Sequence, residues 1–160
     1  MVAIAVISLI ASIVVVNLAN PLGDANHESA KARLAEFDLQ TRELARAKGK
    51  PVDLVFDLSD NLIYRQDPQS GDLIASKIKL PGDAKIAQLL VRGQSLVAGT
   101  MSIRCSRSGL TPTYAVKIET PNAFPTWLLV AGTTGQFTEL KNESEIEQIW
   151  TQAILGRDAD

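Results

Sequence analysis

Few residues in the chain have side chains that could act as a nucleophile, a general base or a metal ligand. His27 is the only histidine, and together with its neighbour Glu28 it could form a ligand pair. Because a single histidine at the start of a predicted helix is usually solvated, we predict no site there. Cys105 lies in an apolar run with no histidine in a partner position, so we expect a small buried hydrophobic side chain that forms no internal disulfide.

The remaining polar candidates are typical of turns and surfaces. Four aspartates fall in predicted turns without the spacing of a calcium loop: Asp57, Asp60, Asp67 and Asp72. Arg104 and Arg107 form a small basic spot that we expect to be ordinary surface. The chain contains no phosphate-binding glycine loop, no Gly-x-Ser-x-Gly and no His/Cys metal spacing. The sequence therefore predicts neither an enzyme nor a bound cofactor or metal.

Residues 1–19 form an apolar segment without charge, and the first ionisable side chain is that of Asp24. About 20 apolar residues suffice for a helix to cross a bilayer. We therefore predict a transmembrane and assembly helix in this segment, with a cleaved signal peptide and a buried core helix as alternatives. Its main apolar residues are Met1, Val2, Ile4, Val6, Ile7, Leu9, Ile10, Ile13, Val14, Val15, Val16 and Leu18.

Residues 20–50 continue this helix as an amphipathic segment. Residues 20–24, Asn-Pro-Leu-Gly-Asp, are of types that loosen or bend a helix, Asn26 or Ser29 could cap its second half, and Gly49 followed by Pro51 should stop it. One face carries the apolar residues that should pack on the rest of the domain: Ala30, Leu34, Phe37, Leu44 and Ala45. The other faces carry charged residues: Lys31, Glu36, Arg42, Glu43 and Arg46.

Residues 51–140 predict a domain of short β-strands separated by turns, and residues 141–160 a short C-terminal helix and tail. The expected strands are Leu54–Leu58, Leu62–Tyr64, Leu73–Leu80, Ile86–Val91, Ser95–Cys105, Tyr114–Glu119, Trp127–Val130 and Gln136–Leu140. Helical spacing returns at Ile146, Ile149, Trp150 and Ile154, behind a possible Ser144 cap. We expect Trp127 and Trp150 to be core residues. The predicted class is α+β, with a long N-terminal helix packed on an antiparallel sheet or a two-sheet sandwich.

The N-terminal segment resembles the first helix of type IV pilins and of the pseudopilins of type II secretion, in the run Met1–Ser12 and its continuation Ile13–Leu18. Many members of that family have a proline where this chain has Val16, and Pro21 could serve instead. The family's Gly-Phe-Thr-Leu-Ile-Glu cleavage signature is absent, since Met1 aligns two residues beyond its glutamate. We expect Met1 to be an internal methionine of a longer reading frame or the chain to be truncated; a true start at Met1 is the alternative.

The rest of the chain resembles one group of that family. A long helix, a Gly-Lys-Pro joint at residues 49–51 and the segment Val52–Asp57 together resemble general secretion pathway protein H, a minor pseudopilin, and FimT minor pilins. Ile103–Gly109 and Thr133–Phe137 are compatible with the turns of those domains. The resemblance implies a structural subunit in the bacterial inner membrane, with a single span and a periplasmic β domain. Its implied partners are other pseudopilin subunits and, at a filament tip, secreted cargo.

Two other functions compete with the pseudopilin reading. A DNA-binding minor pilin of the FimT kind would need a basic strip, whereas the end of this chain is acidic at Glu139, Glu143, Glu145 and Glu147. The whole chain has 16 Lys and Arg against 18 Asp and Glu, so no nucleic acid partner is expected. The third possibility is a membrane-anchored periplasmic binding domain unrelated to pilins.

Overall fold

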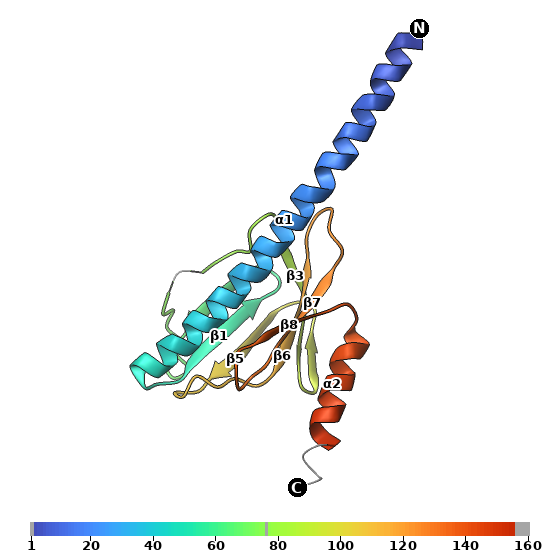
Figure 1. Ribbon diagram of the computed structural model, residues 1–160. Coiled ribbons are helices and arrows are strands. Elements are labelled where there is room, and N and C mark those ends of the chain that lie inside the picture. Colours follow the sequence, from blue (N-terminus) through green and yellow to red (C-terminus); the bar gives the residue numbers. More distant parts are fainter. Residues whose placement is uncertain (1, 76, 156–160) are drawn as a thin grey trace.

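The computed structural model describes residues 2–75 and 77–155, and within this range the side chains of 23–75 and 77–151. Helix α1, Val2–Lys48, is one continuous helix of 47 residues that includes Pro21. Its second half lies across the β-strands, and its first half extends away from them (Figure 1). The predicted cap at Asn26 or Ser29 is wrong, because no helix begins there. Ser29 Oγ instead donates to the carbonyl of Ala25, one turn earlier, at 2.8 Å.

The predicted end of the helix is confirmed at Gly49. This glycine has a φ of +61°, the left-handed conformation that commonly ends helices, and its N–H donates to the carbonyl of Arg46 at 3.2 Å. The chain then reverses at Pro51 into strand β1, Val52–Asp57. Strand β1 therefore runs back beneath the second half of α1, as Figure 1 shows.

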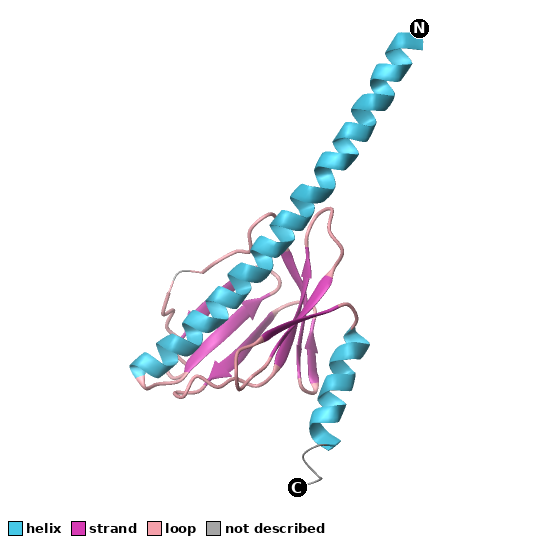
Figure 2. Cartoon of the chain, viewed as in Figure 1, coloured by secondary structure: helices cyan, strands magenta, loops and turns pink. Residues whose placement is uncertain are grey.

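The strands form two antiparallel sheets (Figure 2), which confirms the α+β class and the two-sheet alternative. The three-stranded sheet has the order β2-β1-β5, and the five-stranded sheet has the order β4-β3-β6-β7-β8. Besides β1, the strands are β2 (Leu62–Gln66), β3 (Lys85–Val91), β4 (Gln94–Leu96), β5 (Thr100–Cys105), β6 (Tyr114–Glu119), β7 (Thr126–Val130) and β8 (Phe137–Leu140).

Two predicted strands differ from the structure. The stretch Leu73–Leu80 is not a strand; it touches β2 only through the isolated bridges Gln66↔Leu73 and Ile63↔Ile78. The run Ser95–Cys105 is divided between β4 and β5, which belong to different sheets. Gly99 separates them with a φ of +89°, a conformation that does not continue a strand. Alternation predicted the first run and apolar character predicted the second, and neither pattern shows which partner strand is available.

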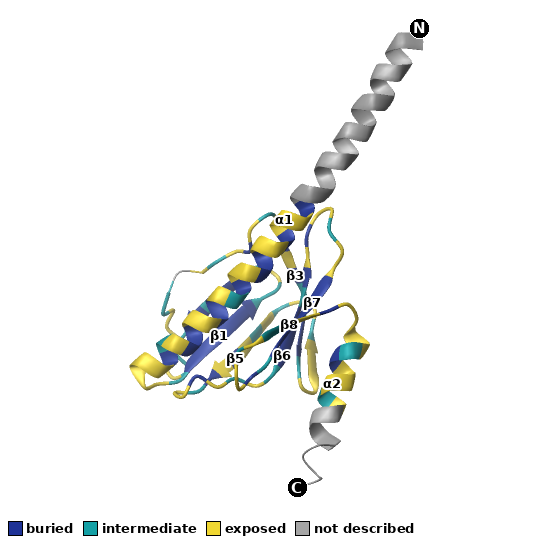
Figure 3. Ribbon diagram, viewed as in Figure 1, coloured by how far each residue is buried: buried dark blue, intermediate teal, exposed yellow. Residues whose placement is uncertain are grey.

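The main core lies between α1 and the two sheets. Buried residues of α1 face the strands, and exposed residues lie on its outer side (Figure 3). The core joins apolar side chains of α1 to those of both sheets, including Leu34, Leu54, Phe56, Leu89 and Val116. Each fully buried aliphatic side chain of this kind contributes about 1.5–3 kcal/mol. The second half of α1 is therefore part of the main core.

Helix α2, Glu143–Leu155, covers a second apolar cluster on the five-stranded sheet. Ile146 is fully buried against Trp127, and Trp150 packs at the edge of the same cluster, so both tryptophans belong to the core as predicted. The helix begins one residue before the predicted Ser144 cap. The Glu145 carboxylate accepts from the Lys141 backbone N–H at 3.3 Å and so stabilises that helix start.

Within residues 23–75 and 77–151, whose side chains the structure describes, no helix is long and apolar enough to cross a membrane. The predicted membrane segment, residues 1–19, lies outside the part of the chain whose side chains are described.

Candidate functional site: the joint between α1 and the β domain

The predicted apolar face of α1 packs on the sheets. Ala30, Leu34 and Phe37 are buried in the main core, which confirms their assignment. Ala45 is buried in a small separate cluster, and Leu44 is half-buried beside it. The apolar residues predicted for the membrane and assembly helix, from Met1 to Leu18, lie outside the side chains that the structure describes.

A buried ion pair lies beside this apolar face, and its arginine is one of the charged residues that the sequence placed on the other faces of the helix. Arg42 and Asp38 are each only 1% exposed, and Arg42 Nε donates to Asp38 Oδ2 at 2.6 Å. The Tyr114 hydroxyl of β6 donates to the other carboxylate oxygen of Asp38 at 2.7 Å. Burial, and then the charge of Asp38, raise the pKa of Tyr114 well above its ordinary value. Tyr114 therefore stays protonated and acts as the donor.

Arg42 also holds two loops of the β domain to the helix. Its Nη1 donates to the carbonyls of Gly109 at 3.2 Å and Gly132 at 2.7 Å. Its Nη2 donates to Thr111 Oγ1 at 2.7 Å and to the Ala131 carbonyl at 3.5 Å. Together with the bond to the aspartate, these contacts use all five N–H donors of the guanidinium. Arg42 therefore stabilises one position of α1 relative to the β domain, the position in which acceptors from both loops surround its guanidinium.

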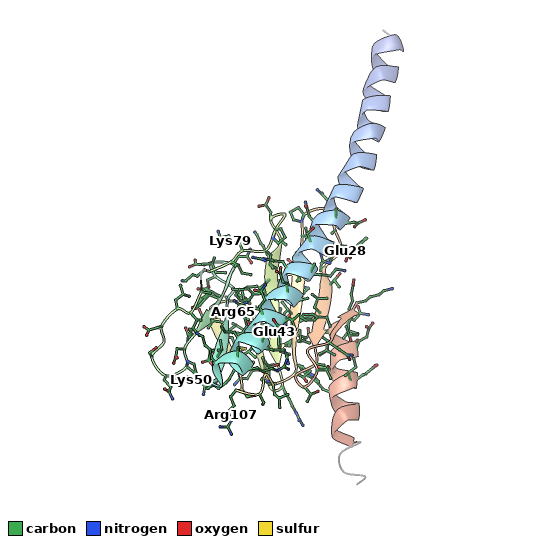
Figure 4. All side chains as sticks on the ribbon, turned by 60° about the vertical axis from the view of Figure 1, so that its left-hand side comes forward. Glu28, Glu43, Lys50, Arg65, Lys79 and Arg107 are labelled. Carbon is green, nitrogen blue, oxygen red and sulfur yellow. The ribbon has the colours of Figure 1, made fainter. Side chains whose placement is uncertain are left out.

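Arg65 of β2 forms a second connection, approaching α1 from the three-stranded sheet. Its Nε donates to Thr41 Oγ1 at 2.8 Å, and its Nη2 donates to the Phe37 carbonyl at 3.1 Å and to Gln40 Oε1 at 3.0 Å. The guanidinium also lies 3.8 Å from the centre of the Phe37 ring, within the range of a cation–π contact. In Figure 4, Arg65 lies beside the half of α1 that crosses the domain.

A third polar contact ties α1 to the five-stranded sheet near the point where the helix leaves the domain. His27, predicted to be solvated, is 5% exposed, and its Nδ1 lies 3.0 Å from Thr120 Oγ1. Burial, and then the charge of Lys31, lower the pKa of His27 below 6.5, so the neutral ring is favoured. Lys31 Nζ bonds to Glu139 of β8 at 2.6 Å and also pairs with Glu28.

The prediction of a solvated His27 is wrong, and Lys31, predicted outside the apolar face, is covered for the same reason. Their spacing along α1 places them beside the apolar face, and strands far away in the sequence cover that side of the helix. For Lys31, burial disfavours the charged form, but the hydrogen bonds with Glu139 and Glu28 outweigh it and raise the pKa of Lys31. The lysine therefore stays charged while it is largely covered.

The aspartates and surface arginines behave as predicted. Asp67 Oδ1 accepts from the backbone N–H groups of Gln69 at 2.8 Å and Ser70 at 3.2 Å, and these bonds lower the pKa of Asp67. Asp57 and Asp60 share a turn, since Asp57 Oδ1 accepts from the Asp60 N–H at 3.1 Å. Arg104 is exposed and forms a bidentate pair with Asp53, which shares its sheet. These carboxylates shape turns and neutralise charge.

The described part of the chain contains no group of three or more His, Cys, Asp or Glu side chains that could hold a metal ion. Cys105 is fully buried against Val52, as expected, and burial raises the pKa of its thiol. A thiol with a raised pKa has little thiolate at neutral pH and is a poor nucleophile. The described residues at the joint position a helix.

Sequence reasoning missed Asp38, Arg42, Arg65 and Tyr114 as a group. One local signal existed, because Asp38 and Arg42 have the i,i+4 spacing of a helical ion pair. Nothing in the sequence placed the Tyr114 hydroxyl or the loop carbonyls around that pair. Comparison of the chain with protein-family models, with curated proteins and with solved structures found no match.

Proposed function

We propose that the chain is a structural subunit of a membrane-anchored filament, of the minor pseudopilin kind found in type II secretion. The observation that supports this function best is the division of α1 into two halves. The second half is held to the β domain by the apolar face and by three polar contacts, whereas the first half extends away from the domain (Figure 1). A helix attached in this way can anchor the protein through its first half while its second half holds the β domain in a fixed position relative to the helix.

The dimensions of the helix agree with an anchor. At 1.5 Å per residue, residues 2–23 of α1 extend about 33 Å, close to the ~30 Å hydrocarbon core of a bilayer. That stretch carries no ionisable side chain in the sequence. In a filament the same apolar stretch would pack among the helices of neighbouring subunits, so that it remains out of water.

The arginines of the joint support a structural role over nucleic-acid binding. Arg42 and Arg65 are buried and bonded to protein acceptors, and the exposed Arg104 is neutralised by Asp53. Basic side chains bound in this way cannot release counterions from a phosphate backbone. We therefore expect protein subunits and the inner membrane as partners, with secreted cargo as a further one.

The proposal is tested by membrane extraction and cross-linking of the full chain in a bacterial host that carries type II secretion subunits. The chain should resist extraction at alkaline pH, and Ile10→Asp should make it extractable, because a charge inside a membrane helix is costly. In a Cys105→Ala background, Val14→Cys should form disulfide cross-links with neighbouring helices, whereas Val97→Cys, on the β domain and 69% exposed, should not. Complete extraction of the unaltered chain, or equal cross-linking at both positions, would contradict the proposal.

A further inference from the structure

The loop between β6 and β7, residues 120–125, lies beside α1 where the helix leaves the β domain (Figure 1). Two contacts hold it there. Thr120 Oγ1 lies 3.0 Å from His27 Nδ1, and Gly23 packs so closely that a Cβ added to it would lie 2.7 Å from the Asn122 carbonyl oxygen. Direct packing of Asn122 against Gly23 therefore fixes the position of the loop relative to the helix.

This loop carries no charge and exposes a large apolar side chain to solvent. Phe124 is 90% exposed, more than any other large hydrophobic side chain in the described part of the chain, where the next value is 69% for Val97. Pro121 and Pro125 on either side are also exposed, and the stretch Thr120–Thr126 contains no ionisable residue. A single exposed hydrophobic residue is common on protein surfaces. The exposure of Phe124 therefore indicates a contact surface only in combination with its location.

That location coincides with the end of the uncharged segment of α1. Phe124, Asn122 and Ala123 line one shallow pocket together with Asp24, the first ionisable residue of the chain. If residues 1–23 are anchored in a bilayer, Asp24 lies at the boundary between lipid and water, and Phe124 lies at the same level. Aromatic rings favour this interfacial layer, and apolar groups of peripheral segments enter it by about 5–10 Å.

We infer that the β6–β7 loop inserts Phe124 into the interfacial layer of the membrane that anchors α1; this inference rests on the anchoring proposed above. The two prolines favour insertion because they lack N–H groups that would lose hydrogen bonds to water. The charged groups around His27, which contacts Thr120 of this loop, are mixed in sign: Asp24, Glu28, Lys31 and Glu139. Attachment should therefore depend on apolar contact and not on anionic lipid. With the helix and the loop both attached, the domain would have one fixed orientation on the membrane.

The test uses the full chain, in a Cys105→Ala background, inserted into neutral phosphatidylcholine vesicles. Phe124→Cys is labelled with an NBD fluorophore, and circular dichroism checks that the fold is retained. The matched control is Leu110→Cys, a 45% exposed position in a loop that Arg46 contacts through the Ser108 carbonyl. The rise of α1 from Gly23 to Arg46 is about 35 Å, so the control lies far from the proposed membrane surface.

The expected result is a blue-shifted emission at position 124 that nitroxide lipids quench, more strongly with the nitroxide near the headgroup than deep in the acyl chain. Position 110 should show neither effect. If the chain floats with the vesicles but both probes report water, the loop inference is wrong and the anchoring stands. If the chain does not float, both are wrong. A blue shift at 124 that grows with the protein-to-lipid ratio and resists nitroxide quenching would assign the loop to a neighbouring subunit and overturn the inference.

Discussion

Replacing Arg42 by methionine should destabilise the joint more than any exposed substitution on α1. Methionine keeps the apolar stem but leaves the carboxylate of Asp38, 1% exposed, with the Tyr114 hydroxyl as its remaining donor. Removing one partner of a buried ion pair costs about 3–5 kcal/mol. The carbonyl of Gly109 also loses its donor, at about 1–3 kcal/mol for a buried acceptor that water does not reach, whereas the carbonyl of Gly132 keeps the Thr111 N–H at 3.0 Å. We expect a loss of at least about 4 kcal/mol in the free energy of unfolding.

The assay is urea unfolding of the full chain in a non-ionic detergent, followed by the fluorescence of Trp127 and Trp150. The matched control is Arg33→Met, the same substitution on the same helix. Arg33 is exposed and pairs with the exposed Glu36, an interaction worth about 0–1 kcal/mol. The difference between the two variants isolates the effect of burial from the effect of the residue type.

A difference of less than about 1 kcal/mol between the two variants would refute the reasoning, because the buried ion pair would then contribute no more to the free energy of unfolding than a surface ion pair does. A second variant tests the cause. Asp38→Asn removes the charge that Arg42→Met leaves uncompensated, so the double substitution should cost clearly less than the sum of the two single ones. Simple additivity would mean that the two side chains do not act as a pair.

Three further predictions follow from burial. Ile146→Ala, at a fully buried position under α2, should cost about 2–5 kcal/mol in urea unfolding, and the half-exposed Ile149→Ala should cost markedly less. Burial holds the pKa of His27 in the folded protein below its unfolded value of 6.5. The contribution of His27 to the free energy of unfolding is therefore fully present above that pH, and it is lost as the pH falls from about 7 toward the folded-state pKa. Unfolding free energies measured between pH 7.5 and 5.5 should show this slope, and His27→Gln should flatten it; an unchanged slope would contradict the assignment. The Cys105 thiol should react with a disulfide reagent slowly in the native protein and quickly in urea, whereas equal rates would mean that the thiol is accessible.

Local patterns in the sequence predicted the elements that depend on neighbouring residues. The end of α1 at Gly49 followed from a glycine that adopts a positive φ and a proline two residues later. The strands Tyr114–Glu119 and Trp127–Val130 followed from alternation and from a continuous apolar run between turns. The apolar face of the helix, from Ala30 to Phe37, followed from spacing alone.

Pairing between strands could not be predicted in the same way. The run Leu73–Leu80 alternates like a strand, yet β2 offers it only two isolated bridges. The run Ser95–Cys105 divides between two sheets because β4 pairs with β3, and β5 pairs with β1, on either side of Gly99. Strand partners are chosen by contacts across the whole domain, and a local pattern does not contain them.

The sequence by itself determined the α+β class, the long helix, its apolar face and the turn chemistry of residues such as Asp67, because each rests on the properties of nearby residues. Only the tertiary structure decided that Arg42, Lys31 and His27 are covered and that Phe124 is exposed beside α1. For the two charged side chains, the physical reason is the supply of hydrogen-bond acceptors. A charged side chain is buried only where acceptors surround it, and four of the five acceptors of Arg42 come from Gly109, Thr111, Ala131 and Gly132, more than 60 residues away along the chain.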